Sequence, residues 1–206
     1  NHLEGMFAFA VYDRNRQKIL IARDRLGQKP LHYYHNKNLF VFSSELQSIV
    51  KHPKIDRTVN NQAIHDYLSL QYIPQPYTIY KNVFKLPPAS FLELNIINKK
   101  IKITKYWQCD YGNKVPISYN DAKHELRCLL EKAVTKRFMS DVPLGAFLSG
   151  GIDSTIITGL MAKQTREPVK TFTIGFNEAK YDERKYAKTA SVNFKTEHYE
   201  KIVDPS

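Results

Sequence analysis

The stretch that decides the fold is Ala146-Phe147-Leu148-Ser149-Gly150-Gly151-Ile152-Asp153-Ser154-Thr155. Three apolar or small residues lead into a Ser-Gly-Gly turn, and residues 156–162 that follow are mostly apolar. This pattern predicts a strand, a tight turn and a helix. In an open α/β sheet, such an arrangement places a helix N-terminus at the carboxyl end of a strand, which is where ligands bind.

The composition of the turn favours an anionic ligand. Gly150 and Gly151 have no Cβ atom, so the backbone there can adopt positive φ and approach a ligand closely. Ser149 and Ser154 add hydroxyl groups, and the free N–H groups of the helix start favour phosphate. Asp153 would repel phosphate unless a divalent cation lay between them, and Mg²⁺ is the usual partner of phosphate oxygens. We therefore predict a phosphate site with Asp153 as its magnesium ligand.

The motif distinguishes between two classes of phosphate loop. It is not a Walker motif, because no lysine follows the glycines. It resembles the Ser-Gly-Gly-x-Asp-Ser signature of the PP-loop ATP pyrophosphatases, which cleave ATP between its α- and β-phosphates and leave an adenylated substrate. The alternative is a Ser/Gly-rich turn that only starts a helix. The six-residue string between an apolar strand and an apolar helix disfavours that alternative.

Length and composition exclude several other classes of protein. The chain has 206 residues, 42% of them hydrophobic and 25% charged, which is ordinary for one or two globular domains. No apolar run approaches the ~20 residues of a membrane span, and the start lacks the order of a secretory signal. The two cysteines make neither a disulfide framework nor a metal cluster. We therefore predict a cytoplasmic protein with no membrane partner.

The net charge of +11 raises the alternative of RNA binding. The lysines are scattered, as at Lys99, Lys100, Lys102 and Lys105, with little aromatic signature between them. A solvated surface explains this pattern better, so we predict no nucleic-acid partner. Part of the excess charge would also suit nucleotide phosphates or an acidic partner.

The first half of the chain predicts β structure. Four strands are expected in two hairpins, at residues 6–12 with 18–23 and 31–34 with 39–42. Ser44 is the expected N-cap of a short helix, and residues 60–62 are expected to cap another. The polar run 108–116 is the best domain boundary.

The second half predicts alternating helices and strands. Ser118, with Asp121 three residues later, is a capping-box-like helix start. An apolar stripe at helical spacing follows and is assigned to the core: Ala122, Leu126, Leu129, Leu130, Ala133 and Val134. Residues 169–176 predict a second strand. Tyr181, with Asp182 and Glu183 as helix-start acids, is expected to open a further helix.

Strings along essentially the whole chain carry a family resemblance. They are Gly-Met-Phe-Ala-Phe-Ala at 5–10, Arg-Asp at 23–24 with Gly27 and Lys-Pro-Leu at 29–31, Phe-Ser-Ser-Glu at 42–45, Pro-Pro at 87–88, Tyr-Trp at 106–107 and Asp-Val-Pro-Leu-Gly-Ala at 141–146. In this order and spacing they resemble the glutamine-hydrolysing asparagine synthetases. The resemblance covers the later half of their glutaminase domain and the front of their synthetase domain.

The resemblance implies a fold class of two incomplete parts. Residues 1–107 would be the C-terminal part of an α+β, N-terminal-nucleophile-type β-sandwich between helices, with connecting strands. Residues 116–206 would be the N-terminal part of an α/β, Rossmann-like PP-loop nucleotide-binding domain. We therefore expect an internal piece of a longer enzyme. The family nucleophile is a cysteine at the mature N-terminus, and neither Cys109 nor Cys128 lies near it, so this chain should not hydrolyse glutamine.

The resemblance also implies an activity, namely ATP-dependent amidation of aspartate to asparagine through β-aspartyl-AMP with ammonia from glutamine. ATP and magnesium would be the cofactors, aspartate and glutamine the further substrates, and a homodimer is an assembly that the family allows. The ATP or pyrophosphate site would comprise Phe147, Leu148, Ser149, Gly150, Gly151, Asp153, Ser154, Ile174 and Gly175. Of these, Phe147 and Ile174 would lie near the adenine and contact it through backbone groups, because an apolar side chain can only flank the base.

Two alternatives to asparagine synthesis remain open. One is a related PP-loop amidotransferase that acts on another carboxylate, as in surface-sugar modification or lactam formation, because the motif does not choose among acceptors. The other is a non-catalytic remnant that serves as a binding module. The retained Ser-Gly-Gly-Ile-Asp-Ser string argues against decay of the nucleotide site.

Overall fold

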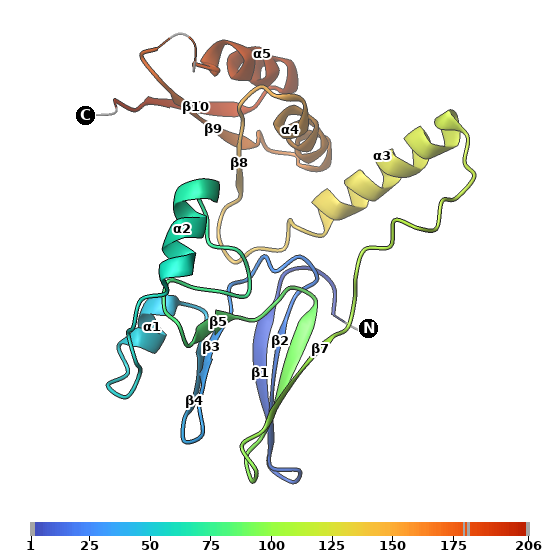
Figure 1. Cartoon of the computed structure of the whole chain (residues 1–206). Helices are drawn as coiled ribbons and strands as arrows, with labels where there is room; N and C mark the ends of the chain where they lie inside the picture. The colour runs from blue at the N-terminus through green and yellow to red at the C-terminus, as the bar shows by residue number, and fades with distance from the viewer. Residues whose placement is uncertain (1–2, 179, 181, 205–206) are drawn as a thin grey trace. The chain divides into compact units, whose positions relative to one another are not determined.

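The computed structural model describes residues 3–178, 180 and 182–204 of the chain. It divides into two compact units, Asn1–Asn113 and Lys114–Ser206 (Figure 1). The division falls inside the polar run 108–116, where the sequence predicts a domain boundary. Tyr181, the expected opening of a helix, lies outside the described residues.

The first unit contains two antiparallel sheets (Figure 1). One has the order β1-β2-β6-β7 and comprises β1 (Ala8–Asp13), β2 (Lys18–Arg23), β6 (Ser90–Asn95) and β7 (Ile101–Lys105). The other has the order β4-β3-β5 and comprises β3 (His32–His35), β4 (Phe40–Ser43) and β5 (Val83–Lys85). Both predicted hairpins are confirmed, because β1 pairs with β2 and β3 pairs with β4.

The core of this unit lies between the two sheets. Ile21 of β2 and Leu92 of β6 are fully buried partners, and they belong to one apolar cluster with Tyr33 of β3. Strands with one face in a core alternate inward apolar and outward residues, which is the pattern seen in β6. On the other face of the three-stranded sheet, the short helix α1 (Leu46–Val50) buries Ile49.

Helix starts in the first unit follow the sequence only in part. Asn60 caps α2 (Asn61–Leu70) by accepting the N–H of Gln62 at 3.2 Å, as predicted. The expected cap at Ser44 is wrong, because the N-cap of α1 is Glu45 and its side chain makes no capping bond. The N–H of Glu45 donates to the hydroxyl of Ser43 at 3.2 Å, and the helix begins one residue later than predicted.

The loop after β2 is built around two adjacent buried charges. The Asp24 carboxylate is 1% exposed and accepts four backbone N–H bonds at 2.9–3.4 Å, from Phe7, Leu26, Gln28 and Lys29. The buried guanidinium of Arg23 donates to three backbone carbonyls at 2.6–2.8 Å, those of Gly27, Lys29 and Leu86. Buried charges persist when hydrogen bonds satisfy them in this way. The two side chains therefore hold the loop in a single shape.

The second unit is a parallel α/β layer. It comprises α3 (Tyr119–Thr135), β8 (Gly145–Phe147), α4 (Ile152–Gln164), β9 (Lys170–Gly175), α5 (Arg184–Phe194) and β10 (Glu197–Ile202), with the strand order β10-β9-β8. Neighbouring strands are joined by α4 and α5, as parallel pairing requires. Along β9, Thr171 and Thr173 are buried while Phe172 and Ile174 are exposed, so one face of this sheet is covered and the other is open.

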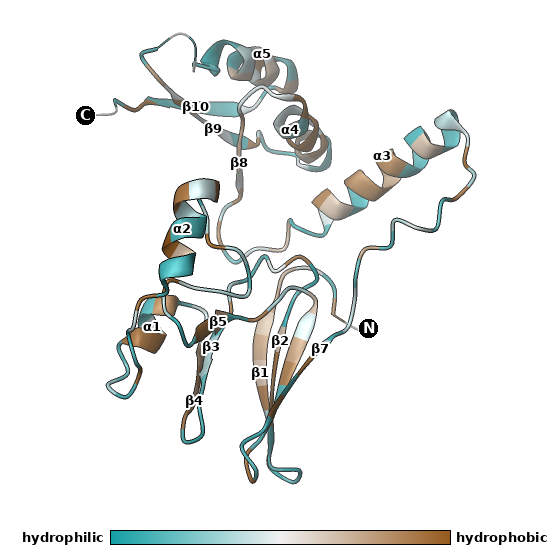
Figure 2. Cartoon of the chain, viewed as in Figure 1, coloured by the Kyte–Doolittle hydropathy of each residue, from teal (hydrophilic) through white to brown (hydrophobic). Residues whose placement is uncertain are grey.

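The stripe on α3 is only partly buried. Ser118 caps this helix through the N–H of Asp121 at 3.2 Å, as predicted. The assignment of the whole stripe to the core is wrong, because Val134 is buried whereas Leu126 and Leu129 are more than half exposed. Among the described helices and strands, α3 packs chiefly against α4, and part of its apolar stripe stays exposed. Figure 2 shows apolar residues along α3. Among the described residues, none of the helices combines the length and the hydropathy of a membrane span.

Candidate nucleotide site

The predicted turn begins just after β8, at Leu148, whose backbone groups and side chain all have partners within the protein. Leu148 is 1% exposed, and its N–H donates to the carbonyl of Phe172 at 2.9 Å. Its own carbonyl accepts the hydroxyl of Thr173. The side chain packs with Ala187 and Ala190 of α5. Because both backbone groups of Leu148 are engaged within the protein, this residue is suited to support the turn.

The two predicted serines meet across the turn. The hydroxyl oxygens of Ser149 and Ser154 lie 3.0 Å apart. The N–H of Gly151 donates to the Ser149 hydroxyl at 3.3 Å, and the Ser154 hydroxyl donates to the Gly151 carbonyl at 3.2 Å. These bonds fold residues 149–154 into a closed bend with both hydroxyls on one side.

The two glycines of the turn differ in their conformation. Gly150 has φ of +81°, in the region that favours glycine. Gly151 has φ of −66°, which any residue adopts, so the expectation of positive φ is wrong for Gly151. A Cβ on Gly150 would lie 2.5 Å from the backbone nitrogen of Ala187 and would also meet Tyr186. The structure thus adds a second reason for glycine at position 150, which is close packing against α5.

The helix that follows the turn presents uncapped N–H groups. Gly151 is the N-cap of α4 and makes no side-chain capping bond. The first backbone bond of the helix runs from Thr155 N–H to the Gly151 carbonyl at 3.0 Å, so the N–H groups of residues 152–154 precede the helical ladder. The helix dipole adds a partial positive charge at this end. Phosphate oxygens are the ligands that such an end accommodates.

A cavity of about 560 Å³ adjoins the turn, between α3, β8 and α4. Asp153 and Ser154 lie on its wall, and much of the remaining lining is apolar, including Phe147, Ile157 and Met161. This size and this mixture of apolar wall and few polar groups are typical of small-molecule sites.

The three remaining predicted residues lie on β8 and β9. Phe147 is 79% exposed and stands opposite Phe172, so it shares the open sheet face with Ile174, which is 51% exposed. Gly175 is buried at the end of β9, where a Cβ would collide with the side chain of Arg184. The structure therefore brings Phe147 and Ile174 to the open face of the parallel sheet. Gly175 is covered by the side chain of Arg184.

Sequence reasoning missed Arg184, which has no recognisable motif around it. Its guanidinium makes two bonds to the Asp182 carboxylate, both at 2.8 Å. The hydrogen bond from Arg184 holds the pKa of Asp182 below its ordinary value. Asp182 therefore acts locally as the partner of Arg184. It precedes α5, whose first turn holds no acidic residue and whose N-cap, Glu183, makes no side-chain capping bond.

The described residues contain no group of three or more His, Cys, Asp or Glu side chains that would hold a metal by themselves. Magnesium is commonly held by one or two carboxylates together with the phosphates of its substrate. The exposed Asp153, in the first turn of α4 beside the uncapped N–H groups, fits this second arrangement.

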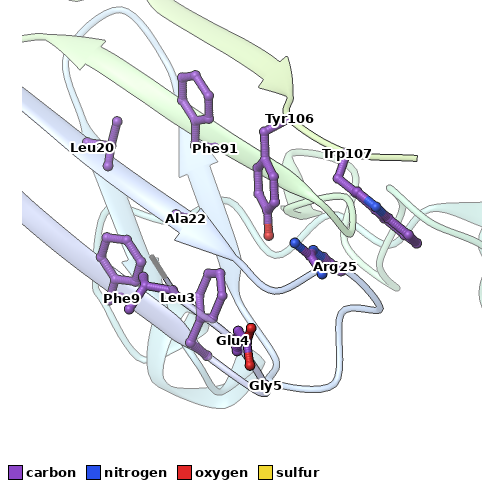
Figure 3. A pocket seen from close by; sticks show the side chains of 11 residues that line it. Leu3, Glu4, Gly5, Phe9, Leu20, Ala22, Arg25, Phe91, Tyr106 and Trp107 are labelled. Carbon is purple, nitrogen blue, oxygen red and sulfur yellow. The ribbon is translucent and has the colours of Figure 1, made fainter. Parts of the chain in front are cut away.

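The first unit holds a separate cavity of about 370 Å³ on its four-stranded sheet (Figure 3). Figure 3 shows aromatic side chains around it, including Phe9, Phe91 and Tyr106. At its rim the guanidinium of Arg25 lies 5.7 Å from the ring centroid of Trp107, a cation–π contact. None of the predicted site residues lines this cavity.

Comparisons with known proteins agree with this division of the chain. Residues 1–107 match the family of the glutamine amidotransferase domain, and residues 125–206 match the asparagine synthase family. The chain belongs to the glutamine-hydrolysing asparagine synthetase family. The resemblance stated from the sequence motifs is thereby confirmed.

Relatives of this synthetase-family chain match nearly all of it. A provisionally named glutamine-hydrolysing asparagine synthetase 2 of Methanocaldococcus jannaschii is 43% identical over 95% of this chain and 38% of its own length. Glutamine-hydrolysing asparagine synthetase 3 of Bacillus subtilis is 36% identical over 86% of this chain and 29% of its own length. An amidase, chyE, of Penicillium rubens is 31% identical over 82% of this chain and 25% of its own length. The chain thus spans less than two fifths of the length of these relatives.

Among solved structures, an allosteric regulatory enzyme of purine biosynthesis aligns with a TM-score of 0.28 and 12% identity. A TM-score this low does not indicate a shared fold.

Proposed function

We propose that this chain supplies the ATP-binding portion, residues 116–206, and part of the glutaminase domain, residues 1–107, of an enzyme that amidates aspartate to asparagine. The observation that carries the proposal is the bend at residues 149–154. It brings two hydroxyls together beside an uncapped helix N-terminus, at the carboxyl end of a parallel strand. Family membership supports glutamine-dependent amidation as the general reaction.

The bend would act on the phosphates that ATP releases as pyrophosphate. The hydroxyls of Ser149 and Ser154 would turn from their partners within the bend to donate to the phosphate oxygens. The N–H groups of residues 152–154 would donate hydrogen bonds to the same oxygens. Such preorganised donors stabilise the charge that develops on the leaving pyrophosphate as the aspartate carboxylate attacks the α-phosphate. The amide-forming step would follow when ammonia displaces AMP from β-aspartyl-AMP.

Magnesium would supply charge neutralisation between Asp153 and the phosphates. The adenine would lie against Phe147 and Ile174, whose exposed side chains offer an apolar surface. Leu148 would support the bend by packing against α5, and Gly175 would leave room for the Arg184 side chain.

The first unit would contribute part of an N-terminal-nucleophile-type sandwich, with the nucleophile and glutamine-binding groups supplied from outside this chain. We propose cytoplasmic location and a homodimeric assembly on the same family grounds. Amidation of a different carboxylate is the second candidate, and the match to a protein named as an amidase favours keeping it.

Product analysis separates these two candidates. A protein of the relatives' length that contains this chain, supplied with ATP, glutamine and magnesium, should convert aspartate to asparagine with release of AMP and pyrophosphate. Asparagine failing to form while another acid is amidated would reject aspartate as the acceptor.

Asp153→Asn should show whether the carboxylate acts through magnesium. In the presence of Mg²⁺, the variant is expected to bind ATP at least tenfold more weakly than the 206-residue wild-type chain, since one metal ligand is lost. In EDTA the order should reverse or vanish, because the substitution removes a repelling charge. Isothermal titration calorimetry with ATP, with and without Mg²⁺, measures both affinities.

Glu167→Gln is the matched control for this charge change. Glu167 is exposed in the loop between α4 and β9, away from the bend in sequence and structure. Its replacement should leave both affinities within twofold of wild type. Equal affinity of the wild-type and Asp153→Asn chains for MgATP would contradict the proposal that Asp153 is a magnesium ligand.

A further inference from the structure

We propose that the first turn of α5 is a positioning element for the bend at residues 149–154, and that Ala187 is its decisive residue. The inference deepens the proposed nucleotide site and rests on it. It assigns a role to a helix face that no predicted site residue occupies.

The contact between α5 and the bend is made by main-chain atoms and by the Cβ atom of Tyr186, whose position is likewise fixed by the main chain. A Cβ on Gly150 would lie 2.5 Å from the carbonyl carbon of Tyr186 and 2.5 Å from the nitrogen of Ala187. Main-chain atoms have no rotamers, so neither side of this contact can relax without moving the helix or the bend. The bend therefore takes its shape from the place where α5 begins.

Ala187 joins this contact to the end of β8. It is fully buried, and it forms an apolar cluster with Leu148 and Ala190. Leu148 immediately precedes the bend. Ala187 thus touches the bend through its backbone nitrogen and supports the preceding residue through its methyl group.

The C-terminal end of α5 also packs closely against a glycine. The ring of Phe194 would lie 2.8 Å from a Cβ on Gly159, which is a buried residue of α4. At the near end, the Glu183 carbonyl accepts the N–H of Ala187 at 3.1 Å. Two glycines, Gly150 and Gly159, therefore face opposite ends of α5. A shift of this helix must be passed to the bend, whose donors have to meet the phosphates within a fraction of an ångström.

The test compares Ala187→Val with Ala190→Val in the 206-residue chain. Both substitutions add the same volume to the same cluster on the same helix, but of the two alanines only Ala187 supplies one of the atoms nearest to a Cβ on Gly150. Both should lower the melting temperature, because both overpack the cluster. Only Ala187→Val should weaken MgATP binding, by about tenfold or more, since that is the scale on which small misplacements of binding groups act.

A ligand-free measurement accompanies the binding measurement. Amide hydrogen exchange of residues 149–154 should be faster in Ala187→Val than in Ala190→Val when the two are compared at equal global stability. If valine prevents folding, the serine pair Ala187→Ser and Ala190→Ser makes the same comparison with a smaller added group.

The outcomes separate this inference from the proposed function. Failure of the wild-type chain to bind MgATP would contradict the nucleotide site. The exchange rates of residues 149–154 in the Ala187 and Ala190 variants would then be the only test of the positioning role of Ala187. Equal MgATP affinity and equal exchange rates in the Ala187 and Ala190 variants would overturn the inference.

Discussion

Replacing Gly150 with alanine is expected to abolish MgATP binding by the 206-residue chain and to destabilise the second unit by about 3–5 kcal/mol. Two costs combine. A non-glycine residue at φ of +81° costs about 1–3 kcal/mol. The added Cβ would also meet the Ala187 nitrogen at 2.5 Å, which forces α5 or the bend to move. Thermal melting and isothermal titration calorimetry measure the two effects.

Gly151→Ala is the control that separates conformation from composition. The φ of −66° at this position suits alanine, and the nearest atom to the added Cβ is the Ser149 hydroxyl oxygen at 3.3 Å. We expect a change in stability below about 1 kcal/mol. A loss of MgATP binding without loss of stability in this variant would show close approach of a ligand to Gly151. A Gly150→Ala variant that melts and binds like wild type would contradict the packing described here.

Replacing Asp24 with asparagine is expected to destabilise the first unit by about 3 kcal/mol at pH 7, because the amide offers a single acceptor oxygen to donors that now share two. Urea unfolding followed by the fluorescence of Trp107, the one tryptophan in the sequence, measures this loss. Glu93→Gln is the control, because its pair with Lys18 at 3.6 Å lies on the surface and is worth less than about 1 kcal/mol.

The same carboxylate predicts how stability depends on pH. Burial raises the pKa of Asp24, but the four backbone N–H bonds together lower it by more than burial raises it. The pKa of Asp24 therefore lies below its ordinary value. A pKa lower in the folded than in the unfolded state adds stability above the unfolded value of about 3.9, and this stability is lost as the pH falls through the folded value. The gap in stability between wild type and Asp24→Asn should therefore shrink below about pH 4. A gap that stays constant down to pH 2 would contradict the buried, charged form of Asp24.

Short-range patterns predicted much of this fold. The two hairpins, the Asn60 and Ser118 caps and the strand–turn–helix at residues 146–162 all depend on residues that are close in sequence. Interactions between residues close in sequence determine such elements, so a short stretch of sequence is enough to predict them.

Long-range contacts were beyond the reach of this reasoning. The sequence marks Gly150 as glycine, but only the structure shows that α5 lies against it. Leu126 and Leu129 have core-like spacing yet are exposed, because burial depends on which element packs against α3. The bonds that join Asp24 and Arg23 to the surrounding loop likewise depend on backbone groups brought together by the fold.

The site residues divide along the same line. The motif placed Ser149, Ser154 and Asp153 around one helix start, and the structure brings the two serine hydroxyls within 3.0 Å of each other. Leu148 and Gly175 lie at the predicted positions but are buried, with Leu148 bonded to β9 and Gly175 covered by Arg184. Their ATP-binding roles remain predictions.

Titration of the ¹⁵N-labelled 206-residue chain with MgATP, followed by the amide signals of its assigned spectrum, tests the central claim most directly. A nucleotide held by the bend should shift the amide signals of residues 149–154 in a saturable way, with the largest changes at the start of α4. Saturable shifts confined to the aromatic cavity of the first unit, or an unchanged bend at saturating MgATP, would contradict the phosphate site.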